Sequence, residues 1–209
     1  MQVRPLTPQA LVSELLDRVD THAADPWTRI AIDGAPEAAT AELADALVDP
    51  LRVRGREVIR VRTCDYLRPA SLRLEYGHHD PDSYYLDWFD FNGLRREVLD
   101  PLAAGGSGHV LPALRDPDTG RSPRLERVPL PQRGVVIVDG PLLLGGELPF
   151  ELTVHLWLPP AALQRRASDS QRWRLPAFDR YTAEVRPERV ADYVVRVDRP
   201  GHPAAIDAW

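Results

Sequence analysis

Residues 29–43, which read RIAIDGAPEAATAEL, decide how the rest of this 209-residue chain is organised. Ile30 and Ile32 alternate with their neighbours as the apolar positions of a β-strand do, and the run ends at Asp33 and Gly34. A helical spacing of apolar residues begins a few positions later. The stretch therefore predicts a strand, a glycine turn and a helix in direct succession.

The same order frames the phosphate-binding motif G-x-x-x-x-G-K-[ST]. Gly34 supplies the first glycine. Ala39 stands at the second glycine, Thr40 at the lysine and Ala41 at the Ser/Thr that holds magnesium. All 26 basic residues of the chain are arginines, so no lysine elsewhere can take over. Glu37 adds a carboxylate that would repel a triphosphate, and we therefore expect a degenerate phosphate loop.

Composition and charge are those of an ordinary globular protein, with 44% apolar and 27% charged residues. The net charge of −5 and the absence of a basic block argue against nucleic-acid binding. No apolar run reaches the roughly 20 residues that span a bilayer, and no secretory signal is visible. The single cysteine, Cys64, fits a reducing compartment. These features predict a cytoplasmic protein with one domain over residues 1–209.

Strand and helix patterns alternate along the chain. Apolar or alternating runs predict strands at 27–33, 57–62, 134–139, 152–158 and, as the last strand before a proline-containing tail, 193–197. Helical patterns lie at 8–22, 38–51, 72–77, 94–102 and 159–167. This alternation predicts an α/β fold with a doubly wound parallel sheet flanked by helices. A turn at 118–120 between two short apolar runs predicts a hairpin insertion over 109–132.

Five segments carry motifs in a fixed order. They read IAIDG at 30–34, DYLRP at 65–69, DPDSYYLDWFD at 80–90, VVIVDGPLLL at 135–144 and ERVADYVV at 188–195. In order and spacing they resemble the uridine kinase/phosphoribulokinase family of P-loop kinases, above all short bacterial uridine-kinase-like proteins. The resemblance implies a P-loop NTPase-type fold with ATP and magnesium as ancestral cofactors, although weak or absent binding is expected here. It divides the chain into a degenerate P-loop unit, a substrate-side segment, the hairpin and an arginine-rich lid, at 28–62, 63–104, 109–132 and 165–182.

The resemblance also implies a general base two residues before an aromatic, after the second strand. Here the aromatic is Tyr66 and Cys64 holds the base position. Asp65, one residue away, is the candidate base if the loop is re-formed, and otherwise a turn acid. Cys64 is either a nucleophile or a buried thiol.

Substrate contacts are implied at Tyr66, Tyr85, Asp87 and Asp90, because carboxylates accept two hydrogen bonds from sugar hydroxyls and aromatic rings stack on bases. Each aromatic side chain fits the core equally well. Asp139 matches the acid that supports magnesium through water, or else caps a turn. The phosphate side is implied at Gly34 and Thr40 of the loop and at the lid arginines Arg165, Arg166, Arg172 and Arg174. Arginine forks suit phosphate oxygens, although a solvated arginine-rich helix explains the same residues.

Three functions fit this sequence. The chain is a pseudokinase that binds a nucleoside or phosphorylated metabolite, an active nucleoside kinase with a non-standard loop, or an enzyme of another reaction class that reuses the nucleoside pocket. Loss of one preorganised charged donor already lowers a rate by roughly 10²–10³. The loop therefore favours the loss of ordinary ATP-dependent transferase activity. The expected partner is a small-molecule ligand, and members of the family often self-associate.

Overall fold

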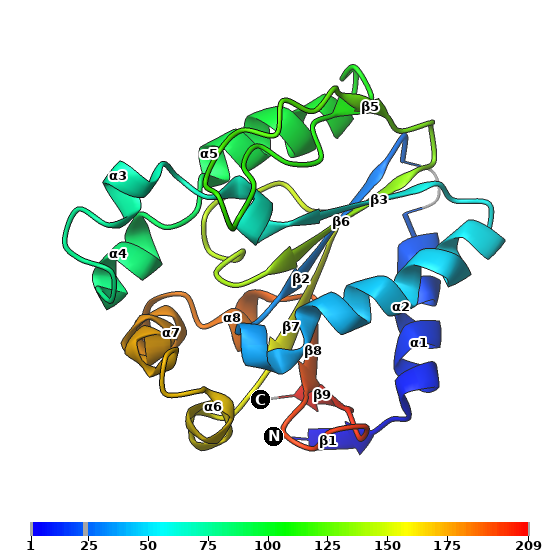
Figure 1. Ribbon diagram of the computed structural model, residues 1–209. Helices are drawn as coiled ribbons and strands as arrows, with labels where there is room; N and C mark the ends of the chain where they lie inside the picture. The colour runs from blue at the N-terminus through cyan, green and yellow to red at the C-terminus, as the bar shows by residue number, and fades with distance from the viewer. Residues whose placement is uncertain (1, 23–24, 209) are drawn as a thin grey trace.

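A seven-stranded sheet runs through the computed structural model, which describes residues 2–22 and 25–208, and helices cover both of its faces (Figure 1). Its strands are β1 (Gln2–Pro5), β2 (Thr28–Asp33), β3 (Val58–Arg62), β6 (Val135–Gly140), β7 (Leu152–Trp157), β8 (Tyr193–Arg196) and β9 (Ala204–Ala208). The order across the sheet is β1-β9-β8-β7-β2-β6-β3. The five strands from β8 to β3 are parallel, which confirms the predicted doubly wound parallel sheet.

The centre of the sheet forms where the sequence is most continuously apolar. Every residue of β6 is buried, as expected of a parallel strand covered by helices on both faces. β2 pairs with β6 from Thr28 opposite Val135 to Asp33 opposite Gly140. This register sets the loop after β2 beside the end of β6.

The far edge of the sheet corrects one expectation. The run at 193–197 is not the last strand, because β9 follows it and pairs antiparallel with both β8 and β1. β9 reads AAIDA, a pattern too short and too weakly apolar to stand out after the prolines at 200 and 203. The sequence pattern did not predict β1 either, because this strand is also short and weakly apolar.

The helices are α1 (Pro8–Asp20), α2 (Thr40–Val53), α3 (Ala70–Arg73), α4 (Pro81–Leu86), α5 (Phe91–Leu94), α6 (Pro160–Arg166), α7 (Leu175–Glu184) and α8 (Pro187–Val190). Thr7 caps α1 by accepting a hydrogen bond from Ala10 N. The helix expected from 38 begins only at Thr40, because the short 3₁₀ turn η1 (Pro36–Ala38) precedes it. The helix expected over 94–102 is helical but changes type, from α5 through the π-turn η3 (Arg95–Leu99) to the 3₁₀ turn η4 (Asp100–Leu102).

The predicted hairpin insertion is present as a two-stranded ladder of β4 (His109–Val110) with β5 (Val128–Pro129). Two further 3₁₀ turns lie near the site. The turn η2 (Thr63–Tyr66) follows β3, and the turn η5 (Arg172–Arg174) precedes α7. Among the described residues, none of the helices combines the length and apolar character that a bilayer crossing needs. The loops after β2, β3 and β6 meet at one edge of the sheet, where ligand sites of open α/β folds form.

Candidate functional site

The β2–α2 loop, residues 34–39, makes a 3₁₀ turn and then a left-handed turn before α2 begins. Ala39 has φ 65° and ψ 42°, a left-handed conformation, at the position of the motif's second glycine. Gly34 packs closely, because a Cβ there would lie 3.1 Å from Leu156 O and 3.2 Å from Thr40 Cγ2. Side chains at both glycine positions are therefore constrained, and Ala39 adopts its conformation at a steric cost.

Two amides of the β2–α2 loop are bonded within the loop itself. Ala38 N donates to Ala35 O at 2.8 Å, and Ala39 N donates to Pro36 O at 3.3 Å. Pro36 has no N–H to offer. A phosphate-binding loop aims such amides at its ligand, whereas here they close a 3₁₀ turn.

Glu37 and the lid residue Arg174 flank the buried ring of Tyr84. Glu37 Oε2 and Arg174 Nε are both shielded from solvent and find no hydrogen-bond partner among the described residues. The Arg174 guanidinium lies 5.2 Å from the centroid of the Tyr84 ring. Burial raises the pKa of the Tyr84 hydroxyl, while the charges of Arg174 and Glu37 act on it in opposite directions. One acidic and one basic group thus act on the same buried tyrosine.

The other lid arginines have different surroundings. Arg166 donates from Nη1 to Glu37 O at 3.0 Å and from Nη2 to Val197 O at 2.9 Å, which fastens α6 to the loop. Arg172 pairs with Asp169 at 2.8 Å, and Arg165 is exposed. Of the four predicted arginines, Arg166 contacts the loop, and Arg174 lies over the Tyr84 ring.

Asp139, at the end of β6, is held by an arginine from the neighbouring strand. Arg60 Nε and Nη2 donate to Asp139 Oδ1 at 3.0 and 2.8 Å, and Arg60 also contacts Asp45 on α2. Burial raises the pKa of the Asp139 carboxyl, and the hydrogen bonds from Arg60 oppose that rise. Within residues 2–22 and 25–208, no three His, Cys, Asp or Glu side chains gather as a metal site.

The candidate base is also ion-paired. Arg62 Nε and Nη2 donate to the two carboxylate oxygens of Asp65 at 2.9 and 2.7 Å. Asp65 O accepts hydrogen bonds from Leu114 N and Arg115 N, so the 3₁₀ turn that carries it is tied to the hairpin. Cys64 is half-buried, and burial raises the pKa of its thiol.

The predicted substrate contacts lie near one another but engage other parts of the chain. Tyr66 is fully buried in the core, where its hydroxyl donates to Leu111 O at 2.5 Å. Asp90 caps α5 by accepting from Gly93 N at 2.8 Å, and Asp87 pairs with Arg68. The Tyr85 hydroxyl donates to Glu184 Oε2 on α7 at 3.0 Å.

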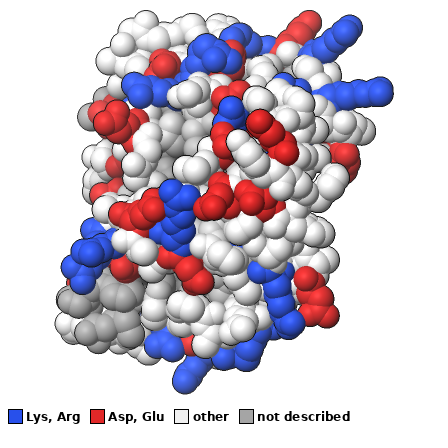
Figure 2. Space-filling view, turned by 90° about the vertical axis from the view of Figure 1, so that its left-hand side faces the viewer, with Lys and Arg blue, Asp and Glu red and all other residues white. Residues whose placement is uncertain are grey.

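The lid is packed against the substrate-side segment. Tyr84, Trp88 and Trp173 contact one another with ring centroids 5.4–5.6 Å apart. On the surface, Arg180 of α7 reaches Asp82 of α4 at 2.9 Å. Acidic and basic side chains are interspersed on this side of the molecule (Figure 2). Aromatic and ionic contacts together close α7 onto α4.

A buried polar cluster that the sequence analysis did not single out supports the start of the loop. Asp33, fully buried, accepts from Leu143 N at 2.9 Å and lies 2.7 Å from His155 Nδ1. The Tyr181 hydroxyl accepts from Leu144 N at 3.0 Å, and its pKa is raised by burial and by the charge of Asp33. The available signals were the acid that ends the first strand and the lone histidine in the apolar run 152–158. The cluster joins the loop, β7 and the lid helix α7.

Beside the β2–α2 loop lies an apolar cavity of about 340 Å³, the loop-side pocket. Leu11 of α1 and Leu43 of α2 form its walls, Ala39 borders it from the loop, and Val197 lies beyond the end of β8. Arg166 and Arg199 add the positive groups of its lining. A cavity of this size and character suits a flat apolar ring with a polar substituent.

Three solved structures of kinases resemble the chain. One, described as a possible uridine kinase from Bacillus stearothermophilus, has 21% sequence identity and a TM-score of 0.65, over 87% of this chain and 98% of that one. A candidate fructose transport system kinase from Silicibacter sp. TM1040 has 22% identity and a TM-score of 0.59, over 89% and 95%. D-glycerate 3-kinase from Cryptococcus neoformans has 16% identity and a TM-score of 0.51, over 85% and 79%.

These likenesses confirm the P-loop kinase-type fold that the motifs predicted. No protein-family model matches the chain, and no curated protein sequence matches it.

Proposed function

We propose that this protein binds a nucleoside-type small molecule on a P-loop kinase fold and does not transfer phosphoryl groups from ATP. The observation that carries the proposal is the β2–α2 loop, where the amides of Ala38 and Ala39 bond to the loop's own carbonyls and Glu37 contributes a shielded carboxylate. A triphosphate needs inward-pointing amides and a positive charge at this position. The residues of the β2–α2 loop do not fit a triphosphate.

The residues expected to bind magnesium support the same proposal. Ala41 offers no hydroxyl, and the carboxylate of Asp139 is bonded to Arg60. A divalent cation would have to displace a guanidinium from a nearly buried carboxylate. ATP and magnesium are therefore ancestral cofactors that this chain no longer uses.

The loop-side pocket supports a neutral ligand. Its lining is apolar apart from a few polar groups, as in sites that hold heteroaromatic rings. Of the charged groups in the lining, Glu42 penalises an anionic substituent, and Arg166 already donates to Glu37 O and Val197 O. A nucleoside fits these constraints better than a phosphorylated metabolite does.

A titration of uridine and of uridine 5′-monophosphate into the protein, followed by calorimetry, tests this proposal. We expect saturable uridine binding and an affinity for the monophosphate at least tenfold lower, about 1.4 kcal/mol. Glu42→Gln removes the repelling charge and should narrow that difference, while Glu75→Gln, at an exposed position far from the pocket in sequence, should leave it unchanged. Ala46→Trp, which fills the pocket, should abolish uridine binding. Tighter binding of the monophosphate in the unmodified protein contradicts the proposal.

A second candidate function rests on one observation, the shielded Nε of Arg174, which has no hydrogen-bond partner among the described residues. A lid arginine in this place could supply the positive charge that the missing lysine supplies in a kinase. An assay of phosphate transfer from ATP to uridine with magnesium separates the two functions. Turnover that is lost in Arg174→Gln but kept in Arg165→Gln would establish an active kinase with a non-standard loop.

A further inference from the structure

The sheet opens between β8 and β9. These strands pair only at Val195 opposite Ala205 and Arg196 opposite Ala204. Beyond that point β9 continues beside β1, with Ile206 opposite Val3, while β8 has no register partner on this side among the described strands. The first residues of β8 therefore border a gap in the sheet, here called the β8–β9 notch.

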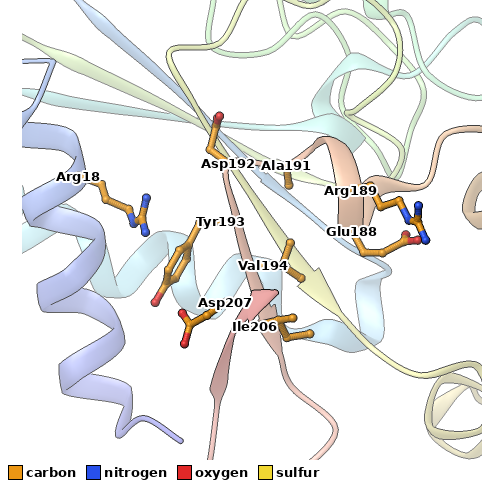
Figure 3. A pocket seen from close by; sticks show the side chains of 9 residues that line it. All are labelled: Arg18, Glu188, Arg189, Ala191, Asp192, Tyr193, Val194, Ile206 and Asp207. Carbon is orange, nitrogen blue, oxygen red and sulfur yellow. The ribbon is translucent and has the colours of Figure 1, made fainter. Parts of the chain in front are cut away.

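A cavity of about 450 Å³ occupies the notch. Tyr193 and Asp207, which line it, lie toward α1, whereas Val194 and Ile206 lie on the other side of the strand, toward α8 (Figure 3). Successive side chains of a strand point to opposite faces, so a cavity lined from both faces must lie in the plane of the sheet. It is thus bordered by strand edges as well as by side chains.

Strand edges carry main-chain hydrogen-bonding groups. Because consecutive residues of a strand direct their N–H and C=O to opposite edges, one of Tyr193 and Val194 directs both groups into the notch. Unpaired edges of this kind bind the amides of extended ligands. The notch therefore favours a ligand with a peptide group.

Charged side chains of both signs border the notch on either side of the sheet. On the α1 side the Arg18 guanidinium lies 4.3 Å from the Tyr193 ring centroid, and Asp207 lies on the same side of the sheet (Figure 3). On the α8 side stand Glu188 and Arg189. This distribution suits a ligand that carries both charges, since an ion of one sign would meet repulsion on both sides.

Glu188 has an unmet hydrogen-bonding requirement. Its Oε2 is shielded from solvent and accepts no hydrogen bond within the described part of the chain. A shielded carboxylate oxygen without a donor is costly, so an ammonium group placed there is favoured. Another acid of the lining, Asp192, already accepts from Thr153 N at 2.8 Å and Thr153 Oγ1 at 2.6 Å.

We propose that the β8–β9 notch is a second binding site, for a small zwitterion of the dipeptide class. The ligand's ammonium bonds to Glu188, its peptide group to the free edge of β8, and its carboxylate to Arg18. The cavity volume lies within the range of small-molecule sites. The notch lies at the start of β8, whereas the β2–α2 loop follows the end of a parallel strand, so this site is separate from the loop-side pocket and does not depend on the function proposed above.

Calorimetric titration of L-alanyl-L-alanine into the full chain tests the proposal. We expect saturable binding that weakens at least tenfold when the amine is acetylated, and again when the carboxylate is amidated. Glu188→Gln should weaken binding of the free dipeptide at least tenfold, and the matched variant Glu75→Gln should leave it unchanged. Amide resonances of Tyr193, Val194 and Ile206 should shift on binding.

Thermal melts of both variants show whether they are folded. Absence of saturable dipeptide binding, equal binding of the blocked analogues, or unchanged binding by folded Glu188→Gln would each overturn the proposal. Resonance shifts confined to the loop-side pocket would overturn it as well.

Discussion

The β2–α2 loop and the acidic–aromatic segment at 80–90 are both predicted from the sequence to belong to a ligand site, and they are built in opposite ways. The loop keeps a left-handed residue at Ala39 and the turn into α2, but the side chains and amides that would hold a phosphate are missing or bonded internally. The segment keeps the residue types that would bind a substrate. Its side chains, however, cap a helix, pair with arginines and pack on the lid.

The difference shows that the backbone conformation of a motif and the chemical groups of its side chains can occur independently of each other. In the loop, backbone geometry survives because the packing of β2 against β6 and α2 demands a tight turn there. In the segment, Tyr84 and Trp88 pack against Trp173, and Tyr85 bonds to Glu184 of α7. We therefore expect substitutions in the segment to act first on stability, and those in the loop to act on ligand selectivity.

The largest effect is expected in the segment. Tyr84 is almost fully buried among Trp88, Phe89, Trp173 and Phe178, so Tyr84→Ala should lower the free energy of unfolding by about 3–5 kcal/mol. Tyr76, exposed on the surface, provides the matched control, and Tyr76→Ala should change stability by less than about 0.5 kcal/mol. Urea denaturation measures both. Equal small effects would mean that the segment's aromatic side chains are free for a ligand.

A smaller, pH-dependent effect is expected at Arg60. Without its hydrogen bonds, burial raises the pKa of Asp139 further above the usual 3.8. A carboxyl whose pKa is higher in the folded state favours folding while protonated, and that contribution is lost as pH rises through the folded-state pKa. Arg60→Gln should therefore cost about 3 kcal/mol at neutral pH and progressively less toward pH 3.8.

The matched control for Arg60 is the exposed pair of Arg52 with Asp49. Arg52→Gln should cost less than about 0.5 kcal/mol at either pH, since solvent screens that pair. Urea denaturation across the pH range gives both costs. A pH-independent cost of Arg60→Gln would show that Asp139 is not stabilised through this ion pair.

The smallest change in the free energy of unfolding is expected from a substitution in the β2–α2 loop, and this substitution should stabilise the protein. Ala39→Gly relieves the left-handed conformation and should raise the free energy of unfolding by about 0.5–1 kcal/mol, after the entropy that glycine loses on folding. Ala103, which is extended, gives the control, because Ala103→Gly should lower stability by a similar amount. Thermal unfolding compares the two. A destabilising Ala39→Gly would indicate that the loop does not hold the left-handed turn in solution.

Much of the fold was predictable because its signals are local. The strand ending at Asp33 and the continuous apolar run of β6 fixed the centre of the sheet. β1 and β9 were missed because they are short edge strands held by pairing rather than by an apolar pattern. The site was less predictable for a related reason. Residue type indicated what Asp65 and Asp139 could do, but only their positions in space show that Arg62 and Arg60 bind them.

The central claim is that this fold no longer has a binding site for a triphosphate, and calorimetric titration with magnesium-ATP tests it most directly. The unmodified protein is compared with a variant in which four substitutions restore the phosphate-binding motif. These substitutions are Glu37→Ser, Ala39→Gly, Thr40→Lys and Ala41→Ser. The account predicts no saturable binding by the unmodified protein, and an affinity at least tenfold higher in the restored variant. Saturable binding by the unmodified protein with a dissociation constant of about 10 μM or lower, unimproved by restoration, would contradict it.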